Sequence, residues 1–152
     1  MARITTQRLL EATAFTLVTF LVALSAANLF LILYIKYSLD EGIQPPFYTV
    51  RCAENSCRCS VDLKFYSLFM IIPIAVAPIG GIIYNKELGR RKGLGPVAFA
   101  LMLAAYFAIG YIAYTVYCDQ CDACARTNCP SGIQSFRCAI IPLTCEYSCL
   151  KP

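Results

Sequence analysis

Residues 93–130 read GLGPVAFALMLAAYFAIGYIAYTVYCDQCDACARTNCP, an apolar run that leads directly into four closely spaced cysteines. The uncharged part, residues 93–118, is 26 residues long. Because a bilayer core about 30 Å thick needs roughly 20 apolar residues of helix, this run is long enough to cross a membrane once. The stretch therefore predicts a membrane-spanning helix whose cysteines emerge together on one side of the bilayer.

Two more stretches lack Asp, Glu, Lys and Arg, namely residues 12–35 and 65–85, which are 24 and 21 residues long. None of the three runs shows the polar face of a surface helix in a soluble protein. We therefore predict an all-α membrane protein with three transmembrane helices and a small, loop-rich, disulfide-stapled extracytoplasmic cap. The predicted segments are a short inner N-terminus (1–11), a first span (12–36), an outer loop (37–64), a second span (65–85), a basic inner loop (86–93), a third span (94–117) and a Cys-rich outer tail (118–152). The first span is too long for a signal-peptide core, so we expect a retained signal anchor.

Basic residues predict the orientation of the spans. The N-terminus and the inner loop carry six basic and two acidic residues, whereas the opposite side carries seven of each, so the net charge of +4 lies on one side. The inner loop contributes Lys86, Arg90, Arg91 and Lys92. The positive-inside rule then places the N-terminus in the cytoplasm, or in a matrix or stroma, and the C-terminus in an extracellular or lumenal space. We favour the plasma membrane or secretory pathway over an organelle inner membrane, and expect no nucleic-acid partner.

The ten cysteines all lie in the predicted outer segments. They are Cys52, Cys57, Cys59, Cys118, Cys121, Cys124, Cys129, Cys138, Cys145 and Cys149. An even number of cysteines in a small region of an oxidising compartment predicts a disulfide framework. The outer loop holds three and the tail seven, so complete pairing within one chain needs at least one bridge between loop and tail. Since Cys57 and Cys59 are poorly placed to bridge each other, we expect one or three such bridges.

Two sharper interpretations of the tail cysteines rest on resemblance. The run C-x2-C-x2-C-x4-C-P, from Cys118 to Pro130, resembles the bacterial ferredoxin motif, although its last spacing is one residue longer, and this resemblance implies an iron–sulfur site. The C-x-x-C at a membrane edge, with further cysteines in a neighbouring loop, resembles the layout of vitamin K epoxide reductase. That resemblance implies a thiol–disulfide oxidoreductase using Cys118, Cys121 and Cys124. However, the first two follow the C-terminus of a span, where the helix dipole disfavours a thiolate.

The chain contains no histidine. This excludes His-ligated haem, zinc–imidazole sites and every Ser-His or Cys-His nucleophile pair. We therefore expect no metal, no other cofactor and no catalytic residue, and we expect that the chain is not an enzyme, with the oxidoreductase as the enzymatic alternative.

Within the spans, a few residues suggest how the helices pack. Ala100, Ala104 and Ala108 form a small-xxx-small ridge, which favours close approach of another helix, with internal packing slightly preferred over a second subunit. Asn28 is expected to form a hydrogen bond between helices. Pro73 and Pro78 each remove a backbone hydrogen bond and predict a kinked second span.

The features above favour a structural function. We predict an accessory subunit of a larger membrane complex, or of a homo-oligomer, that interacts through its helix faces and a rigid disulfide-bonded cap. Its expected partners are the lipid bilayer and other membrane protein subunits. A small channel-forming subunit is a third hypothesis, behind the thiol–disulfide oxidoreductase.

Overall fold

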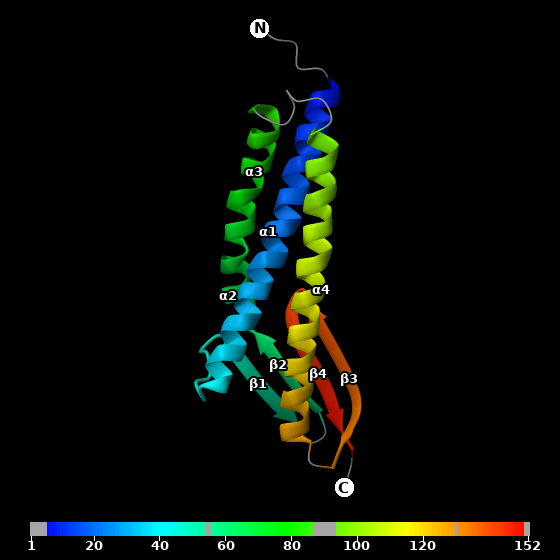
Figure 1. The fold of residues 1–152 in the computed structure, drawn as a ribbon. Helices are drawn as coiled ribbons and strands as arrows, with labels where there is room; N and C mark the ends of the chain where they lie inside the picture. Colours follow the sequence, from blue (N-terminus) through cyan, green and yellow to red (C-terminus); the bar gives the residue numbers. More distant parts are fainter. Residues whose placement is uncertain (1–5, 54–55, 87–93, 130, 151–152) are drawn as a thin grey trace. The chain divides into compact units, whose positions relative to one another are not determined.

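A computed structural model describes residues 6–53, 56–86, 94–129 and 131–150 (Figure 1). The elements are α1 (Thr6–Asp40), β1 (Tyr48–Ala53), β2 (Ser56–Val61), α2 (Leu63–Phe69), α3 (Ile71–Lys86), α4 (Leu94–Asn128), β3 (Ile133–Ile140) and β4 (Leu143–Cys149). The chain divides into two compact units. The first consists of Met1–Ala27 and Met70–Gly110, and the second consists of Asn28–Phe69 and Tyr111–Pro152.

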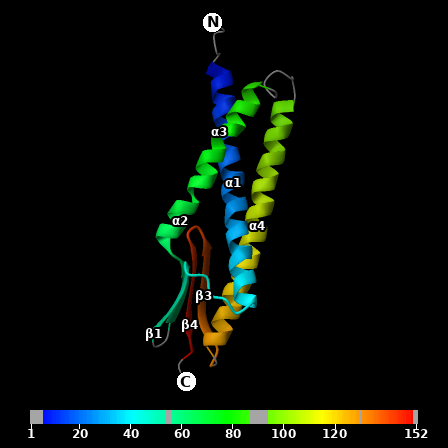
Figure 2. The ribbon, with the colours of Figure 1, turned by 90° about the vertical axis from the view of Figure 1, so that its left-hand side faces the viewer.

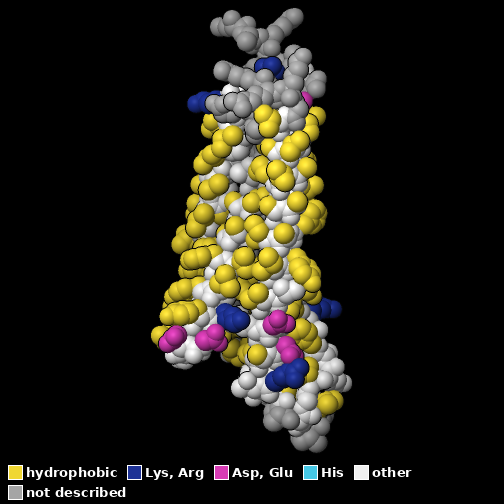
Figure 3. Space-filling view, in the orientation of Figure 1, with side chains coloured by type: hydrophobic (Ala, Val, Ile, Leu, Met, Phe, Trp, Pro, Cys, Tyr) yellow, Lys and Arg dark blue, Asp and Glu magenta, His cyan; other side chains and the backbone are white. Residues whose placement is uncertain are grey.

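Three helical segments are long and apolar enough to cross a membrane, namely Arg8–Asp40, Leu63–Lys86 and Leu94–Asn128. This confirms the expectation of three long apolar helices. On the face that Figure 3 shows, hydrophobic side chains cover the helices. The first and third helices extend beyond their predicted ends, since α1 and α4 have 35 residues each and are therefore about 52 Å long.

The middle candidate span, Leu63–Lys86, consists of two helices, α2 and α3. Asp62 starts α2, because its Oδ1 accepts a hydrogen bond from the backbone N–H of Lys64 at 2.7 Å. The helix is then interrupted at Met70, three residues before Pro73. Pro73 cannot donate to the carbonyl of Phe69, which explains an interruption at this place. Pro78 lies inside α3, which continues through it to Lys86.

Aromatic stacking and a close helix contact hold the first unit together. Phe15 of α1 stacks on Tyr84 of α3 with ring centroids 4.5 Å apart, and Phe99 of α4 packs against Phe15 at 5.7 Å. Along the same α1–α3 contact, a Cβ added to Gly80 would collide with the side chain of Thr19 and lie 3.1 Å from the carbonyl oxygen of Phe15. Glycine is therefore what lets α3 approach α1 this closely.

The predicted alanine ridge does not pack inside the chain. Ala100, Ala104 and Ala108 are all exposed, so the preference for internal packing was wrong. In the first unit, α4 instead packs with the face that carries Ala98, Phe99 and Met102. Helical spacing predicted that the three alanines share one face, but it contained no information on which face of α4 meets a neighbour.

The predicted loop-rich cap is a four-stranded antiparallel sheet, so the all-α, loop-rich description has to be corrected. The strand order is β1-β2-β4-β3, and each strand pairs with its neighbour in an antiparallel manner. The last turns of α4 lie beside this sheet in both ribbon views (Figures 1 and 2). The name "cap" is used below for the sheet together with residues 118–129.

Alternation along the two central strands explains why these residues form a sheet. In β2, Cys57, Cys59 and Val61 are buried, while the residues between them are at least partly exposed. In β4, Leu143, Cys145 and Tyr147 are buried in the same way. A period of two places alternate side chains on opposite faces of a strand, so one face of the sheet is buried and the other is polar.

Candidate functional site

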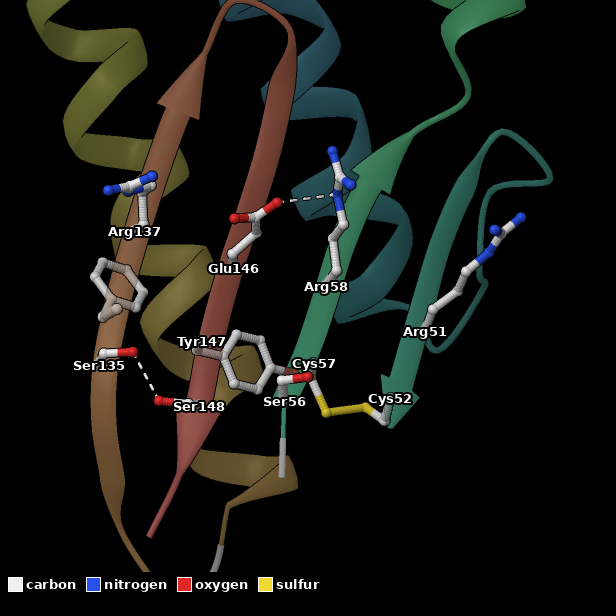
Figure 4. Close-up of a pocket in the computed structure, with 11 residues that line it drawn as sticks. Arg51, Cys52, Ser56, Cys57, Arg58, Ser135, Arg137, Glu146, Tyr147 and Ser148 are labelled. Carbon is white, nitrogen blue, oxygen red and sulfur yellow. Dashed lines mark hydrogen bonds and ion pairs between the residues drawn. A yellow bond between two sulfur atoms is a disulfide. The ribbon is translucent and has the colours of Figure 1, made fainter. Parts of the chain in front are cut away.

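A row of charged side chains crosses the exposed face of the sheet. Arg51 lies opposite Arg58, Arg58 lies opposite Glu146, and Glu146 lies opposite Arg137, so that each of the four strands supplies one residue. All four side chains are exposed, and Figure 4 shows them projecting from the same face. The name "arginine row" is used below for these four residues, which together carry a charge of +2.

Short side chains flank the arginine row and leave room above the sheet. Ser148 of β4 lies opposite Ser56 of β2 on one side and opposite Ser135 of β3 on the other, and each serine is two residues along its strand from the arginine row. The hydroxyls of Ser135 and Ser148 hydrogen-bond at 2.7 Å. A hollow of about 650 Å³ is lined by the arginine row and these serines (Figure 4). Guanidinium groups with nearby hydroxyls are donors suited to carboxylate or phosphate oxygens.

The arginine row is only partly neutralised within the chain. Arg58 Nε lies 3.3 Å from Glu146 Oε1, and both side chains are at least half exposed. Such an exposed pair contributes roughly 0–1 kcal/mol, so an incoming anion competes with it at small cost. In contrast, Arg51 faces Arg58 directly, and like charges opposite each other on neighbouring strands destabilise a sheet.

Disulfides attach the sheet to α4 and make this face rigid. Cys118 of α4 is bridged to Cys138 of β3, and Cys121 of α4 is bridged to Cys145 of β4. A third bridge, Cys129–Cys149, joins the residue after α4 to the end of β4, and a fourth, Cys52–Cys57, closes the β1–β2 hairpin on itself. Crosslinks of this kind restrict relative movement of the segments that they join.

We expected disulfides at all ten cysteines, but only eight of them form bridges. Cys59 and Cys124 carry no disulfide, and their Sγ atoms are 3.1 Å apart, beyond the S–S bond length of about 2.05 Å. No bridge joins the outer loop to the tail in the structure, although all ten cysteines lie within its described residues. The odd numbers of cysteines in the two segments thus leave one thiol from each segment, and these two thiols meet.

Polar groups surround the thiol pair formed by Cys59 and Cys124. Asn128 Nδ2 lies 3.6 Å from Cys124 Sγ and donates to Tyr147 Oη at 3.1 Å. Because the Tyr147 oxygen accepts that bond, its own proton is available for Cys124 Sγ, 3.6 Å away. A hydrogen bond from the Cys59 thiol, together with those from Tyr147 and Asn128, lowers the pKa of Cys124 to about 6 against the opposing effect of burial. The hydrogen bond to Cys124 and burial raise the pKa of Cys59.

The two cysteine motifs in the tail have a structural explanation. Spacings of three residues place Cys118, Cys121 and Cys124 along one side of α4, and this side faces the sheet. The ferredoxin-like cysteines Cys118, Cys121 and Cys129 are therefore taken up by disulfides to strands. Cys118 and Cys121 do not bridge each other as a redox-active C-x-x-C pair would. Within the described residues, no group of three or more Cys, Asp or Glu side chains is placed to hold a metal ion.

The remaining predicted residues are distributed over both units. Asn28 Oδ1 accepts a hydrogen bond from Tyr66 Oη at 3.1 Å, which is the interhelical bond that we expected. Lys86 is the last residue of α3. Arg90, Arg91 and Lys92 lie outside the described residues.

Sequence reasoning missed the arginine row. The signal was present in SCRCSV (56–61) and LTCEYSC (143–149), where polar and buried residues alternate with a period of two. That alternation predicts half-buried strands, but the cysteines were considered only as crosslinking residues. The register that aligns Arg51, Arg58 and Arg137 depends on strand pairing and cannot be obtained from spacing along the chain.

No family model matches this chain, and neither do curated proteins or solved structures.

Proposed function

We propose that this chain is an integral membrane protein that acts as an accessory subunit and binds an acidic segment of a partner subunit through its arginine row. The single observation that carries this proposal is the row itself, which extends across all four strands with a charge of +2. Electrostatic complementarity of this kind steers partners together and fixes their register. An acidic segment of extended chain would meet three guanidinium groups along one line.

The proposed topology follows from the charge pattern. The three apolar helices suit a bilayer, and the excess of basic residues supports an N-terminus on the cytoplasmic side. The cap then lies in an extracellular or lumenal space. Four disulfides are consistent with this assignment, because such compartments are oxidising.

Two further observations support a role as a subunit. The pair Arg51–Arg58 costs stability in the isolated sheet, and a carboxylate placed between the two guanidinium groups would remove that cost. In addition, Ala100, Ala104 and Ala108 present a ridge of small side chains on the exposed side of α4. Such ridges allow close packing of helices from different chains in a membrane.

The proposal is tested by purifying full-length protein from its native membrane in mild detergent and measuring complex size on a native gel. The wild-type protein is expected to migrate as a complex larger than the monomer. The double variant Arg51→Glu/Arg137→Glu is expected to release most of the protein as the smaller species, because carboxylates then face an acidic partner. An Asp- and Glu-rich fluorescent peptide added to the purified protein is expected to bind the wild type and not this variant.

Arg126→Glu serves as the matched control, since Arg126 is also an exposed arginine of the cap but lies on α4, where it pairs with Asp122 at 2.8 Å. This variant is expected to behave as the wild type in both assays. A monomeric wild-type protein, or a complex that the double variant leaves intact, would contradict the proposal. Binding to anionic lipid vesicles without binding to the acidic peptide would also overturn it, in favour of a lipid-binding face.

A further inference from the structure

The thiol pair of Cys59 and Cys124 is not used by the proposed binding face and lies on the opposite side of the sheet. Cys59 belongs to β2 and is fully buried, whereas Cys124 belongs to α4 and is only partly buried. Eight other cysteines are committed to four bridges, so this is the remaining pair in the cap. The Sγ–Sγ distance of 3.1 Å is short enough that a small side-chain movement suffices to form a bond.

The partly buried thiol has access to a hollow. Cys124 lines a hollow of about 640 Å³ together with residues of α1 and α4, among them Lys36, Gln120 and Asn128. The amide oxygen and nitrogen of Gln120 are buried in its wall and have no hydrogen-bond partner among the described residues. Unpaired buried amide groups are costly, so a small rotation of the Gln120 side chain toward the hollow, where it could bond to the peptide group of an incoming chain, would be favourable. Access to Cys124 and polar groups for a ligand thus occur in one place.

The two cysteines differ in a way that separates their chemical roles. Cys124 is surrounded by donors from Cys59, Tyr147 and Asn128, which favour its thiolate. The thiolate is the nucleophile in thiol–disulfide exchange. Cys59 is fully buried and adjacent to Cys124, so it can attack Cys124 but cannot be reached by an external disulfide.

We propose that Cys124 and Cys59 form a thiol–disulfide exchange site, in which Cys124 is the attacking residue, Cys59 is the resolving residue, and the hollow beside Cys124 receives a disulfide carried by a peptide-like molecule. This activity is separate from binding by the arginine row. It also assigns the exchange to a different pair from the C-x-x-C of Cys118 and Cys121.

The exchange proceeds in two balanced steps. The Cys124 thiolate attacks one sulfur of the external disulfide, whose S–S bond breaks, and the released thiolate takes the proton of Cys59. The Cys59 thiolate then attacks Cys124 Sγ, the mixed disulfide breaks, and the second released thiolate takes a proton from solvent. The two protein thiols are oxidised to one disulfide by two electrons, and the external disulfide is reduced to two thiols. In the reverse direction, the bridged pair oxidises a dithiol.

The test uses full-length protein in detergent, reduced under mild conditions, with oxidised glutathione as the probe. In the variant Cys59→Ser, one glutathione is expected to remain attached to Cys124, because no resolving thiol is present. In Cys124→Ser, no adduct is expected, since Cys59 is buried. In the wild type, the expected product is a Cys59–Cys124 disulfide without an adduct. Intact mass and peptide mapping distinguish these products and verify that the other four bridges persist.

The pH dependence of the reaction provides a second measurement on the wild-type protein. Alkylation of Cys124 by iodoacetamide is expected to rise about tenfold between pH 5 and pH 7 and then level off, as the thiolate fraction does for a pKa of about 6. The titratable and charged groups that face the pair or its hollow are Tyr48 of β1, Tyr147 of β4, Tyr117, Asp119 and Lys36 with Asp40 of α1. Burial raises the pKa of Tyr48 and Tyr147, so these phenols stay neutral over this range.

Several outcomes would overturn the proposal. The first is a wild-type Cys59–Cys124 bridge that resists a glutathione buffer as firmly as the other four, which would make it a fifth structural disulfide. The second is equal trapping of glutathione in both single variants. The third is alkylation of Cys124 that continues to rise above pH 8, as for an ordinary thiol. Because the wild-type measurements need no substitution, misfolding of either variant leaves the proposal testable.

Discussion

Tyr66 of α2 donates a hydrogen bond of 3.1 Å to Asn28 of α1, and both side chains are almost completely buried. This bond satisfies the amide oxygen of the one strongly polar side chain in the middle of an apolar helix. It also fixes the depth at which α2 meets α1, because a shift by one residue in either helix would separate the two groups.

Loss of the Asn28–Tyr66 hydrogen bond is expected to cost about 1 kcal/mol of stability, as interhelical hydrogen bonds in membrane hosts do. Asn28→Ala and Tyr66→Phe should each lower the thermal midpoint in detergent. The double variant should lose less than the sum of the two single effects, because one shared interaction is removed twice. Additive losses would show that the two side chains contribute independently.

Gly80→Ala is expected to destabilise the first unit by about 1–3 kcal/mol, because the added methyl group has no room between α3 and α1. Gly110→Ala is the matched control. The nearest atom to a Cβ at Gly110 is Ser25 Oγ at 3.8 Å, an ordinary contact, so this helical glycine should accept alanine without loss. Thermal unfolding of the two variants side by side measures the difference, and equal midpoints would exclude a tight contact at Gly80.

Removal of the Cys121–Cys145 disulfide is expected to cost more than removal of Cys52–Cys57. The two bridges join residues 24 and 5 positions apart, and chain entropy predicts losses of about 3.5 and about 2 kcal/mol, respectively. Replacing each pair by alanines and measuring unfolding of the cap by near-UV circular dichroism provides the comparison. A larger loss for Cys52–Cys57 would mean that the hairpin, and not the α4–β4 connection, limits cap stability.

Without a bound partner, Arg51→Gln is expected to stabilise the cap of the protein by roughly 0.2–1 kcal/mol, because it removes one of two facing guanidinium groups. The same loss of a guanidinium group is expected to weaken binding of an acidic partner. The gain in stability should shrink at high salt, since the repulsion is screened. Cap unfolding and peptide binding are measured on the same sample at low and high salt. A gain in both cap stability and peptide binding, or a loss of both, would contradict repulsion between Arg51 and Arg58.

Hydropathy was sufficient to predict the three long helices but not where the last one ends. Asp119, Asp122 and Arg126 marked the end of the apolar run, and we placed the end of the span at residue 117. In the structure, α4 continues to Asn128, and Asp122 and Arg126 form an i,i+4 pair on its surface. Charged residues end a membrane span, but they do not end a helix that continues into water.

The cysteines allowed prediction of a framework without its architecture. Counting them in each segment led us to expect one or three bridges between the outer loop and the tail, which was wrong, because the structure instead leaves one unbridged thiol in each segment, Cys59 and Cys124, next to each other. The partners within the tail depend on the register of β3 and β4 against α4, which is set by side-chain burial across the sheet. The odd counts therefore indicated that a cysteine of the loop meets a cysteine of the tail, but neither which residues meet nor that they stay unbridged.

The pattern of bridges has a mechanical consequence for the cap. Cys52–Cys57 closes within the hairpin, and the other three bridges join the tail only to itself. With Cys59 and Cys124 reduced, only non-covalent contacts, among them the strand hydrogen bonds and the Arg58–Glu146 ion pair, hold β2 to β4 against a force that pulls on the hairpin. A disulfide between Cys59 and Cys124 would join β2 to α4, which the Cys121–Cys145 bridge already joins to β4, so that covalent bonds would carry the same force. Oxidation of Cys59 and Cys124 to a disulfide would therefore raise the force that is needed to separate the hairpin from the rest of the cap.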